Sequence, residues 1–201
     1  MPVMTDERGP NVRDWVLARE PGTCFTSADV PGRPENVAVT LSRLAAPGGP
    51  IVRARRGIYW RAMPETRFGR AAPDPVEVAL LAAGAGAGLA GVSAANTVGV
   101  STQVPRRPHV AVVGRVPKGL ADVRFTSRAN PHRIRLSPME VAVLEAVRDL
   151  DRHSEVPWPV ARRRIRRMAD AGTVDLEVVA EVAAHERRAG LQKRMTELLA
   201  S

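Results

Sequence analysis

Cysteine is almost missing from this chain of 201 residues, in which Cys24 is the single one. An intramolecular disulfide and a zinc site built on cysteines are therefore excluded. One unpaired cysteine fits a reducing compartment, and the chain does not begin with a basic segment followed by an apolar run, so we expect a cytoplasmic protein. Aromatic residues make up only 3% of the chain, which leaves Val, Leu, Ile and Ala to build the core.

Lysine is also scarce, because Lys118 and Lys193 are the only two. The net charge is nevertheless +9, so nearly all of the positive charge is arginine. The planar guanidinium group binds phosphate and guanine in bidentate fashion, and an arginine-rich chain fits a nucleic-acid partner. A GC-rich coding sequence would also favour Arg, Ala, Gly and Pro, so composition alone leaves both explanations open.

Charge is absent from one long segment, Val78 to Pro105. A membrane-spanning helix needs about 20 strongly apolar residues, whereas this segment is mostly Ala and Gly with polar residues in its second half. We therefore expect buried helices and a loop here, and no membrane partner.

Periodicity in the first part of the chain predicts a winged helix-turn-helix domain over residues 1–65. Asn11 and Ser27 are placed to cap helices, and Val37, Leu41 and Leu44 form one apolar stripe on the clearest helix. The predicted order is helix 11–19, strand 24–26, short helix 27–30, helix 33–46, strand 51–55 and strand 58–61.

A linker rich in Pro and Gly, residues 62–75, leads to a second predicted domain over 75–201. Ser137 and Glu140 form a capping box before one of its helices. Its predicted elements are small strands within 109–126 and helices at 76–83, 93–98, 138–150, 159–171 and 175–199, the last range as two helices. The predicted fold class is α+β and mostly helical: a winged helix-turn-helix, followed by a mixed α/β and then helical C-terminal domain.

The helix over 33–46 and the hairpin after it carry the residues that we assign to DNA binding. Asn36, Thr40 and Arg43 lie at i, i+4 and i+7, a row that a helix in the major groove would present to base edges. Arg33 lies at the helix start, where amide groups favour phosphate. The hairpin adds four arginines, of which the first two would share one face of a strand: Arg53, Arg55, Arg56 and Arg61. The alternative is a solvated basic surface on a winged helix that contacts other proteins.

A second group of arginines falls on the predicted helix over 159–171. This group could hold phosphates or an acidic partner surface, or it could be an ordinary solvated helix face. Its members are Arg162, Arg163, Arg164, Arg166 and Arg167, and all but Arg164 are assigned to the candidate partner or phosphate surface.

Motifs for catalysis, metals and cofactors are weak. Residues 86–91 read GAGLAG, a formal GxGxxG, but they follow a helical pattern rather than a strand, and close packing of small residues explains them better. The histidines are scattered without metal-ligand spacing, and Asp175 fits a helix cap better than a nuclease site. We therefore assign no catalytic residue, no metal ligand and no cofactor.

Two blocks of sequence resemble AbiEi-type antitoxins of bacterial type IV toxin–antitoxin systems. The first consists of PGTCFT (21–26), VTLSRL (39–44) and IVRARRGIYW (51–60) and resembles the winged-helix signature of that family. The second, GVSAANTVGVSTQVP (91–105), resembles the stretch G..AAN.LGLSTQVP. The turn PGGP (47–50) departs from the pattern, which has a shorter and more polar turn. Residues beyond the first two-thirds or so of the chain match nothing.

The resemblance implies a cytoplasmic antitoxin whose winged helix binds inverted repeats in its own promoter and represses it. It also implies that the C-terminal domain counters a nucleotidyltransferase toxin encoded beside it, without a need for a tight complex. We expect a monomer that binds DNA cooperatively or a weak dimer. The residues carried over by match are Arg43, Arg53, Arg56, Gly57 and Tyr59.

Two further hypotheses come from other classes of protein. One is an interaction module whose winged helix binds a protein partner and whose arginines are merely solvated. The other is a nuclease, although the acid–acid–lysine set of such enzymes is missing from the sequence.

Overall fold

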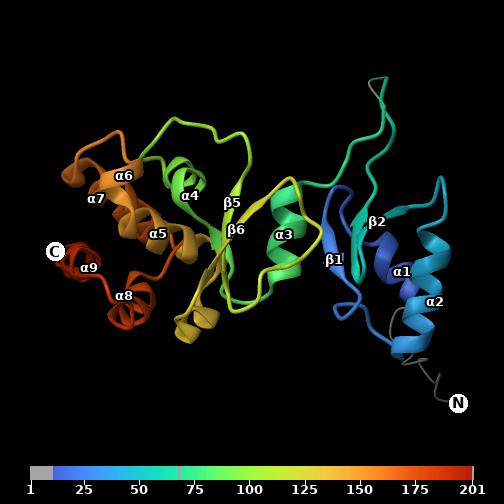
Figure 1. Ribbon diagram of the computed structural model, residues 1–201. Helices are drawn as coiled ribbons and strands as arrows, with labels where there is room; N and C mark the ends of the chain where they lie inside the picture. Colours follow the sequence, from blue (N-terminus) through green and yellow to red (C-terminus); the bar gives the residue numbers. More distant parts are fainter. Residues whose placement is uncertain (1–10, 68, 201) are drawn as a thin grey trace, which may run out of the picture. The chain divides into compact units, whose positions relative to one another are not determined.

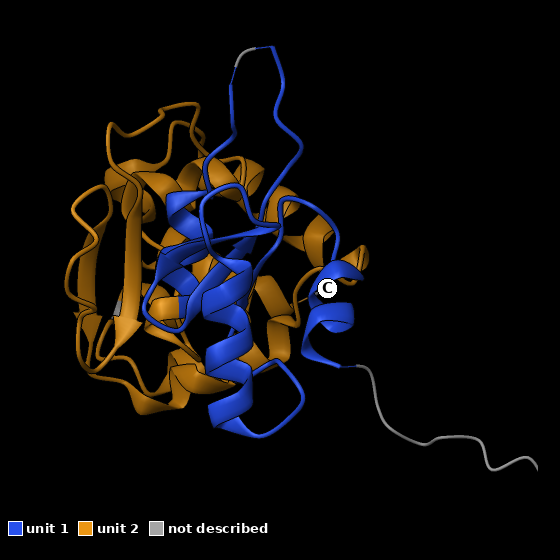
Figure 2. Cartoon of the chain, turned by 90° about the vertical axis from the view of Figure 1, so that its right-hand side faces the viewer, with its two compact units in different colours: residues 1–81 blue, residues 82–201 orange. Residues whose placement is uncertain are grey.

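The computed structural model describes residues 11–67 and 69–200 and has an α+β fold, as the sequence predicts. The chain divides into two compact units, residues 1–81 and 82–201 (Figure 1, Figure 2). This boundary lies inside helix α3 (Pro75–Ala83), whereas the sequence analysis placed the two domains at 1–65 and 75–201. None of the described helices combines the length and the apolar character that crossing a bilayer requires.

In its described residues, unit 1 contains two helices, the first part of α3 and a three-stranded antiparallel sheet with the strand order β1-β3-β2. Asn11 caps the first helix as predicted, because its side chain accepts the amide proton of Asp14 at 3.0 Å. The strands agree with the predicted ranges, and the helices are shorter than predicted. The elements are α1 (Val12–Leu17), β1 (Cys24–Thr26), α2 (Pro34–Leu44), β2 (Ile51–Arg55) and β3 (Ile58–Arg61).

The short helix predicted over 27–30 is wrong, because these residues form a turn. The carboxylate of Asp29 accepts hydrogen bonds from the amide and the hydroxyl of Thr26 at 2.7 and 2.9 Å. The amide of Ser27 donates to the carbonyl of Gly57 at 2.9 Å. Pro31 has no amide proton to continue a helix and disfavours helical backbone at Val30, so the segment stays a turn between β1 and α2.

The core of unit 1 lies between the sheet and its helices. The predicted stripe of α2 is confirmed, since Val37, Leu41 and Leu44 are all buried. Phe25 of β1 stacks on Tyr59 of β3 with ring centroids 5.8 Å apart. Helices α1 and α2 therefore cover one face of the sheet, the face that carries Phe25 and Tyr59.

Unit 2 contains a second three-stranded sheet, of order β4-β5-β6, and helices that pack with it. Strands β5 and β6 are parallel, and β4 is antiparallel to β5. Strand β4 and the 3-10 helix η1 were not predicted, and the helix predicted over 138–150 divides into two near Asp149. The elements are β4 (Gly88–Leu89), α4 (Gly91–Thr97), β5 (His109–Val113), β6 (Arg124–Arg128), η1 (Pro131–Arg135), α5 (Pro138–Arg148), α6 (Leu150–His153), α7 (Trp158–Asp170), α8 (Leu176–Ala184) and α9 (Ala189–Leu199).

The glycines of the GxGxxG segment allow close packing, as predicted. A Cβ atom on Gly86 would lie 2.7 Å from the carbonyl oxygen of Arg133. One on Gly88 would lie 2.5 Å from the carbonyl oxygen of Pro138 and 2.5 Å from Cβ of Val141. Because both contacts involve backbone that cannot easily move, these positions exclude any side chain.

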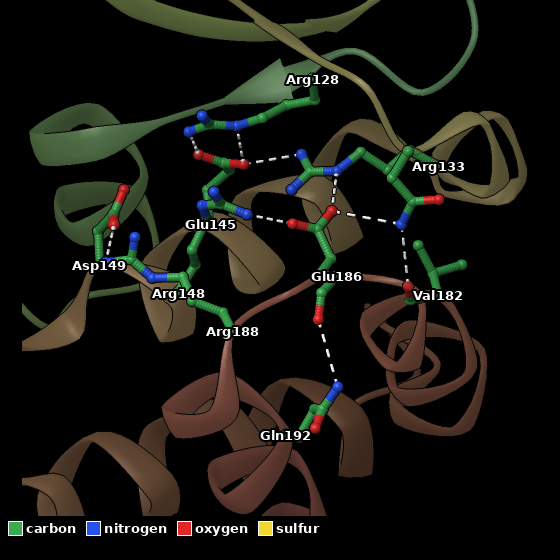
Figure 3. Close-up of polar contacts among 10 residues, drawn as sticks. Arg128, Arg133, Glu145, Arg148, Asp149, Val182, Glu186, Arg188 and Gln192 are labelled. Carbon is green, nitrogen blue, oxygen red and sulfur yellow. Dashed lines mark hydrogen bonds and ion pairs between the residues drawn. The ribbon is translucent and has the colours of Figure 1, made fainter.

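The core of unit 2 also contains buried ion pairs that the sequence analysis did not predict (Figure 3). Arg133 of η1 and Glu145 of α5 are fully buried, and Glu186, which follows α8, is nearly so. Nη1 of Arg133 lies 2.7 Å from Oε1 of Glu145, and its Nε donates to Oε1 of Glu186 at 2.7 Å. One guanidinium group thus joins carboxylates from two different helical regions.

Two half-buried arginines complete this buried network, which we define as Arg128, Arg133, Glu145, Arg148 and Glu186. Arg128 of β6 donates to both carboxylate oxygens of Glu145 at 2.9 and 2.5 Å. Arg148, at the end of α5, pairs with Glu186. The network therefore connects strand β6, helix η1, helix α5 and the segment after α8 (Figure 3).

Both carboxylates of the buried network stay ionised at neutral pH. Burial alone would raise the pKa of Glu145, but the hydrogen bond from Arg128 and the charges of Arg133 and Arg128 outweigh burial, so this pKa is lowered from its ordinary value of 4.5. Burial also opposes ionisation of Glu186, and Arg133 and Arg148 lower its pKa in the same way.

We predict that Glu145→Ala lowers the free energy of unfolding by about 3–5 kcal/mol, because it leaves the charge of Arg133 buried without one of its partners. The measurement is urea unfolding of the full chain. The control is Glu181→Ala, which removes the exposed pair of Arg135 and Glu181 and should cost less than about 1 kcal/mol. Equal losses for the two variants would contradict a special role for the buried pair.

The same network predicts an acid-sensitive fold. Because the pKa values of Glu145 and Glu186 are lowered in the folded state, their contribution to stability is fully present above the unfolded value. It is lost as the pH falls from that value through the lower folded-state pKa. Unfolding at a series of pH values should show this loss in the wild-type chain and a smaller loss in Glu145→Ala.

Substitution of glycine tests the packing at β4. Gly88→Ala should destabilise the chain by roughly 1–3 kcal/mol, because the new methyl group has no space. Gly190→Ala is the matched control: Gly190 lies in α9 with no atom within 4 Å of its virtual Cβ, so this change should stabilise the chain by about 0.5–1 kcal/mol. Thermal unfolding distinguishes the two, and a shift of the same sign in both would refute the packing argument.

Candidate nucleic-acid interface

The outer face of helix α2 presents the predicted row of polar side chains. Asn36 and Arg43 are exposed, and Thr40 is half-buried beside the apolar stripe. Arg33 is the N-cap residue of the helix, but its side chain makes no capping hydrogen bond. Val39 lies on the same exposed side and is 51% exposed. The helix thus offers an amide, a hydroxyl and a guanidinium group to a ligand, with an apolar contact beside them.

The hairpin differs from the prediction at one point that changes the direction of its arginines. Strand β2 has a bulge at Ala54, so that Arg53 is paired with Tyr59 whereas Arg55 is paired with Ile58. Paired residues of an antiparallel sheet point to the same face, and neighbours along β3 point to opposite faces. The prediction that Arg53 and Arg55 share a face is therefore wrong.

The bulge places Arg53 on the side of the sheet that carries α1 and α2. Its partner Tyr59 belongs to the core that these helices cover. Arg53 is exposed, whereas Arg55 is half-buried, with Nη1 buried and without a hydrogen bond to any described residue. Of the two arginines in strand β2, Arg53 is therefore the one that lies on the same side of the sheet as α2 and its polar row.

Arg61, the fourth arginine of the hairpin, is half-buried and has a structural role. Its Nη1 donates to the carbonyl of Pro50 at 2.7 Å, and this contact joins the end of β3 to the residue before β2. Its Nε is buried and makes no hydrogen bond within the described residues. Arg61 thus stabilises the base of the hairpin and is poorly placed to contact a ligand.

The tip of the hairpin lies beside the segment that leads into α2. The carbonyl of Gly57 accepts the amide proton of Ser27, which belongs to the turn between β1 and α2. Gly57 has a φ of +78°, a conformation that favours glycine. Arg56, next to it, is exposed. The tip of the hairpin therefore lies next to the turn that leads into α2, within unit 1.

We call the set Arg33, Asn36, Thr40, Arg43, Arg53 and Arg56 the cationic face. None of its four arginines forms an ion pair with a carboxylate in residues 11–67 and 69–200. Because nothing neutralises these charges locally, the face attracts anions.

Three of the arginines of α7 are engaged in hydrogen bonds to backbone carbonyls. Arg162 donates to the backbone carbonyl of Ala200 at 2.5 Å, and Arg166 also donates to that carbonyl. Arg164 donates to the carbonyl of Gly99. Arg163 and Arg167 are exposed. Of the four residues assigned to a partner or phosphate surface, Arg162 and Arg166 thus donate to the carbonyl group at the end of helix α9. The other two, Arg163 and Arg167, remain exposed.

Asp175 is a helix cap, as predicted. Its carboxylate accepts the amide protons of Glu177 and Val178 at 2.9 and 3.2 Å at the start of α8. The histidines, scattered in the sequence, come together in pairs: the rings of His132 and His185 stack with centroids 3.8 Å apart. In the part of the chain that the structure describes, no three His, Cys, Asp or Glu residues are arranged to hold a metal ion.

The buried network is the polar feature that sequence reasoning missed. Its signal was present, because Glu145 is a lone acid in the otherwise apolar run from Val141 to Val147. An acid on a buried helix face needs a partner, and several arginines lie in the preceding segment. The sequence does not show which of them is buried with it.

Comparison with known proteins adds little to the geometry. No protein-family model and no curated protein matches the chain. Among solved structures, the RV2827C protein from Mycobacterium tuberculosis is similar over 94% of this chain and 74% of that chain, with 19% sequence identity and a TM-score of 0.42. A likeness at this level transfers no function to the chain.

The position of Arg61 yields a test of its structural role. Arg61→Ala should lower the free energy of unfolding by about 0.5–1.5 kcal/mol, because it removes the hydrogen bond to the carbonyl of Pro50, which keeps only the amide of Ala62 as a donor. Arg56→Ala, at the exposed tip of the same hairpin, should change it by less than about 0.5 kcal/mol. Thermal or urea unfolding of both variants gives the comparison, and an unchanged stability of Arg61→Ala would exclude the assigned role.

Proposed function

We propose that unit 1 binds duplex DNA through the cationic face, with α2 in the major groove and the hairpin against the adjacent phosphates. The observation that carries the proposal is that the exposed row of α2 and the unpaired arginines Arg33, Arg53 and Arg56 belong to neighbouring parts of one small unit. An exposed Asn can bind adenine, and Arg can bind guanine, in bidentate fashion. Arginines beside a helix start or at a wing bind phosphate without regard to sequence.

We further propose that the chain is an antitoxin and autorepressor of a type IV toxin–antitoxin operon. This proposal depends on the resemblance of residues 21–26, 39–44, 51–60 and 91–105 to AbiEi-type antitoxins. The DNA partner is then its own promoter with inverted repeats, bound by a cooperative monomer or a weak dimer in the cytoplasm. Unit 2 would counter a nucleotidyltransferase toxin encoded beside it.

One observation favours a second candidate, a protein-interaction module. Val39, exposed in the middle of the outer face of α2, could pack against an apolar patch of a protein partner. It could equally contact the methyl group of thymine, as apolar side chains do in the major groove. The two candidates differ in their response to salt, because only binding to duplex DNA releases condensed counterions.

Two substitutions separate base reading from phosphate contact. Arg43→Ala should reduce the preference for the promoter duplex over a scrambled duplex by about 1–3 kcal/mol. Arg53→Ala should weaken binding to both duplexes alike and reduce the slope of log affinity against log salt by about 1. Fluorescence anisotropy with labelled duplexes from the upstream region of the gene measures both quantities over a series of salt concentrations.

Arg55→Ala is the matched control, since Arg55 has the same side chain on the opposite face of the sheet. We expect it to leave both the preference and the salt dependence nearly unchanged. A salt-independent affinity, or no binding to the upstream region, would reject the DNA proposal and favour the interaction module. Equal effects of Arg43→Ala and Arg53→Ala would reject the division of roles between helix and wing.

A further inference from the structure

Unit 2 contains a pocket of about 270 Å³ whose wall is mostly basic. Three arginines approach it from separate segments: Arg107 from the loop before β5, Arg124 from the start of β6 and Arg152 from α6. The imidazole rings of His109 and His153 also line it. These five residues, which we call the basic pocket, were not connected by any motif in the sequence.

The arginines of the basic pocket have no counter-ion in the described part of the chain. Arg107, Arg124 and Arg152 are exposed and form no ion pair with a described carboxylate. The single acid in the pocket wall, Asp149, lies 3.3 Å from the guanidinium group of Arg188 (Figure 3). The pocket thus keeps a net positive charge that Asp149 does not offset.

The two histidines face one another across a glycine. A Cβ atom on Gly91 would lie 3.0 Å from Nδ1 of His109 and 3.6 Å from Nε2 of His153. Nε2 of His109 lies 2.5 Å from the hydroxyl oxygen of Thr126. The absence of a side chain at Gly91 therefore leaves two ring nitrogens accessible to the same small space.

The backbone around the basic pocket is held by hydrogen bonds. The amide of His109 donates to the hydroxyl of Ser93 at 2.9 Å, and the amide of Arg124 donates to the carbonyl of Pro108 at 2.8 Å. The loop before Arg107 is anchored at Thr102, whose amide and hydroxyl both donate to Glu155. These bonds fix the backbone positions from which the pocket side chains extend.

The electrostatic state of His109 agrees with a positive pocket. Burial lowers its pKa from the ordinary value of 6.5, and the charge of Arg124 lowers it further, against an opposing effect of Glu145. At neutral pH this ring is neutral and provides one hydrogen-bond donor and one acceptor. The arginines, which are always charged, supply the attraction for an anion.

We infer that the basic pocket binds a dianionic phosphoryl group, either as free phosphate or as the end of a small phosphate monoester. Guanidinium groups match the oxygen spacing of phosphate and bind it through paired hydrogen bonds. Three of them without counter-ions fit a doubly charged group better than a carboxylate. The volume is at the lower limit of small-molecule sites, which favours a phosphoryl group with a small carrier over an extended chain.

The test is isothermal titration calorimetry of the full chain with inorganic phosphate, with adenosine monophosphate and with adenosine. We expect heat of binding from at least one of the first two ligands and none from adenosine. Phosphate alone would identify the free anion as the source of the group, and a clearly tighter monophosphate would identify a monoester. No binding of either phosphorylated ligand would overturn the inference.

Variants then locate the bound ligand. Arg124→Gln and Arg152→Gln should each weaken binding roughly tenfold or more, since each removes charge-assisted hydrogen bonds. Arg115→Gln is the matched control, because Arg115 is an exposed arginine of the same unit outside the pocket, and it should bind as the wild type does. Circular dichroism without ligand verifies that each variant is folded.

The inference is independent of the proposed DNA binding, and the same experiments keep the two apart. Arg53→Ala, which should weaken DNA binding, should leave the affinity for phosphate unchanged. If Arg115→Gln or Arg53→Ala weakens phosphate binding as much as the pocket variants do, the anion is attracted by general surface charge and the pocket is not its site. Unchanged affinity in folded Arg124→Gln and Arg152→Gln would also refute the site.

Discussion

The guanidinium group of Arg133 is the constraint on which the arrangement of unit 2 depends. It has no access to water, and the two carboxylates beside it, Glu145 and Glu186, balance its charge. Its Nε donates to Glu186, whereas its buried Nη1 and Nη2 make no hydrogen bond to a described residue. The carboxylates in turn hold Arg128 and Arg148 (Figure 3). A buried charge tolerates few alternative arrangements of its partners, because each misplaced partner leaves an expensive unpaired ion. The relative positions of β6, η1, α5 and the segment after α8 are therefore coupled, although the last of these is far from the other three in the sequence. Asp149, which lines the basic pocket, directly follows Arg148 of the network in the chain, so the two sites share the end of helix α5.

Much of the fold was predictable because its signals are local. The strands of unit 1, the stripe of α2 and the capping box at Ser137 follow from patterns that span only a few residues. The errors occur where a distant or competing contact decides the local conformation. Residues 27–30 form a turn that the bond from the amide of Ser27 to the carbonyl of Gly57 holds against the hairpin. Strand β4 depends on its pairing with β5, and no periodicity in a run of Ala and Gly can reveal that.

The sequence predicted the types of residue in the candidate sites better than it predicted where their side chains point. Sequence spacing correctly separates the polar row of α2 from its buried stripe, since both follow from helical geometry. It cannot show that Arg61 donates a hydrogen bond to the carbonyl of Pro50, or that Arg162 and Arg166 donate to the carbonyl at the end of α9. The sequence shows that an arginine is charged but not where its side chain points. Only tertiary contacts reveal whether the guanidinium group is already hydrogen-bonded within the protein or is available to a ligand. The basic pocket illustrates the converse, because its residues come from segments that no short motif connects.

The bulge in β2 has a consequence for how such a hairpin can change over evolutionary time. Because Ala54 is the extra residue, Arg53 and Arg55 pair with the consecutive residues Tyr59 and Ile58 and so lie on opposite faces of the sheet. Loss of the Ala54 codon would make the two arginines direct neighbours, which also alternate across a strand, so both pairings and both directions would persist. The bulge thus lets the hairpin change its length by one residue without turning either positive charge to the other face.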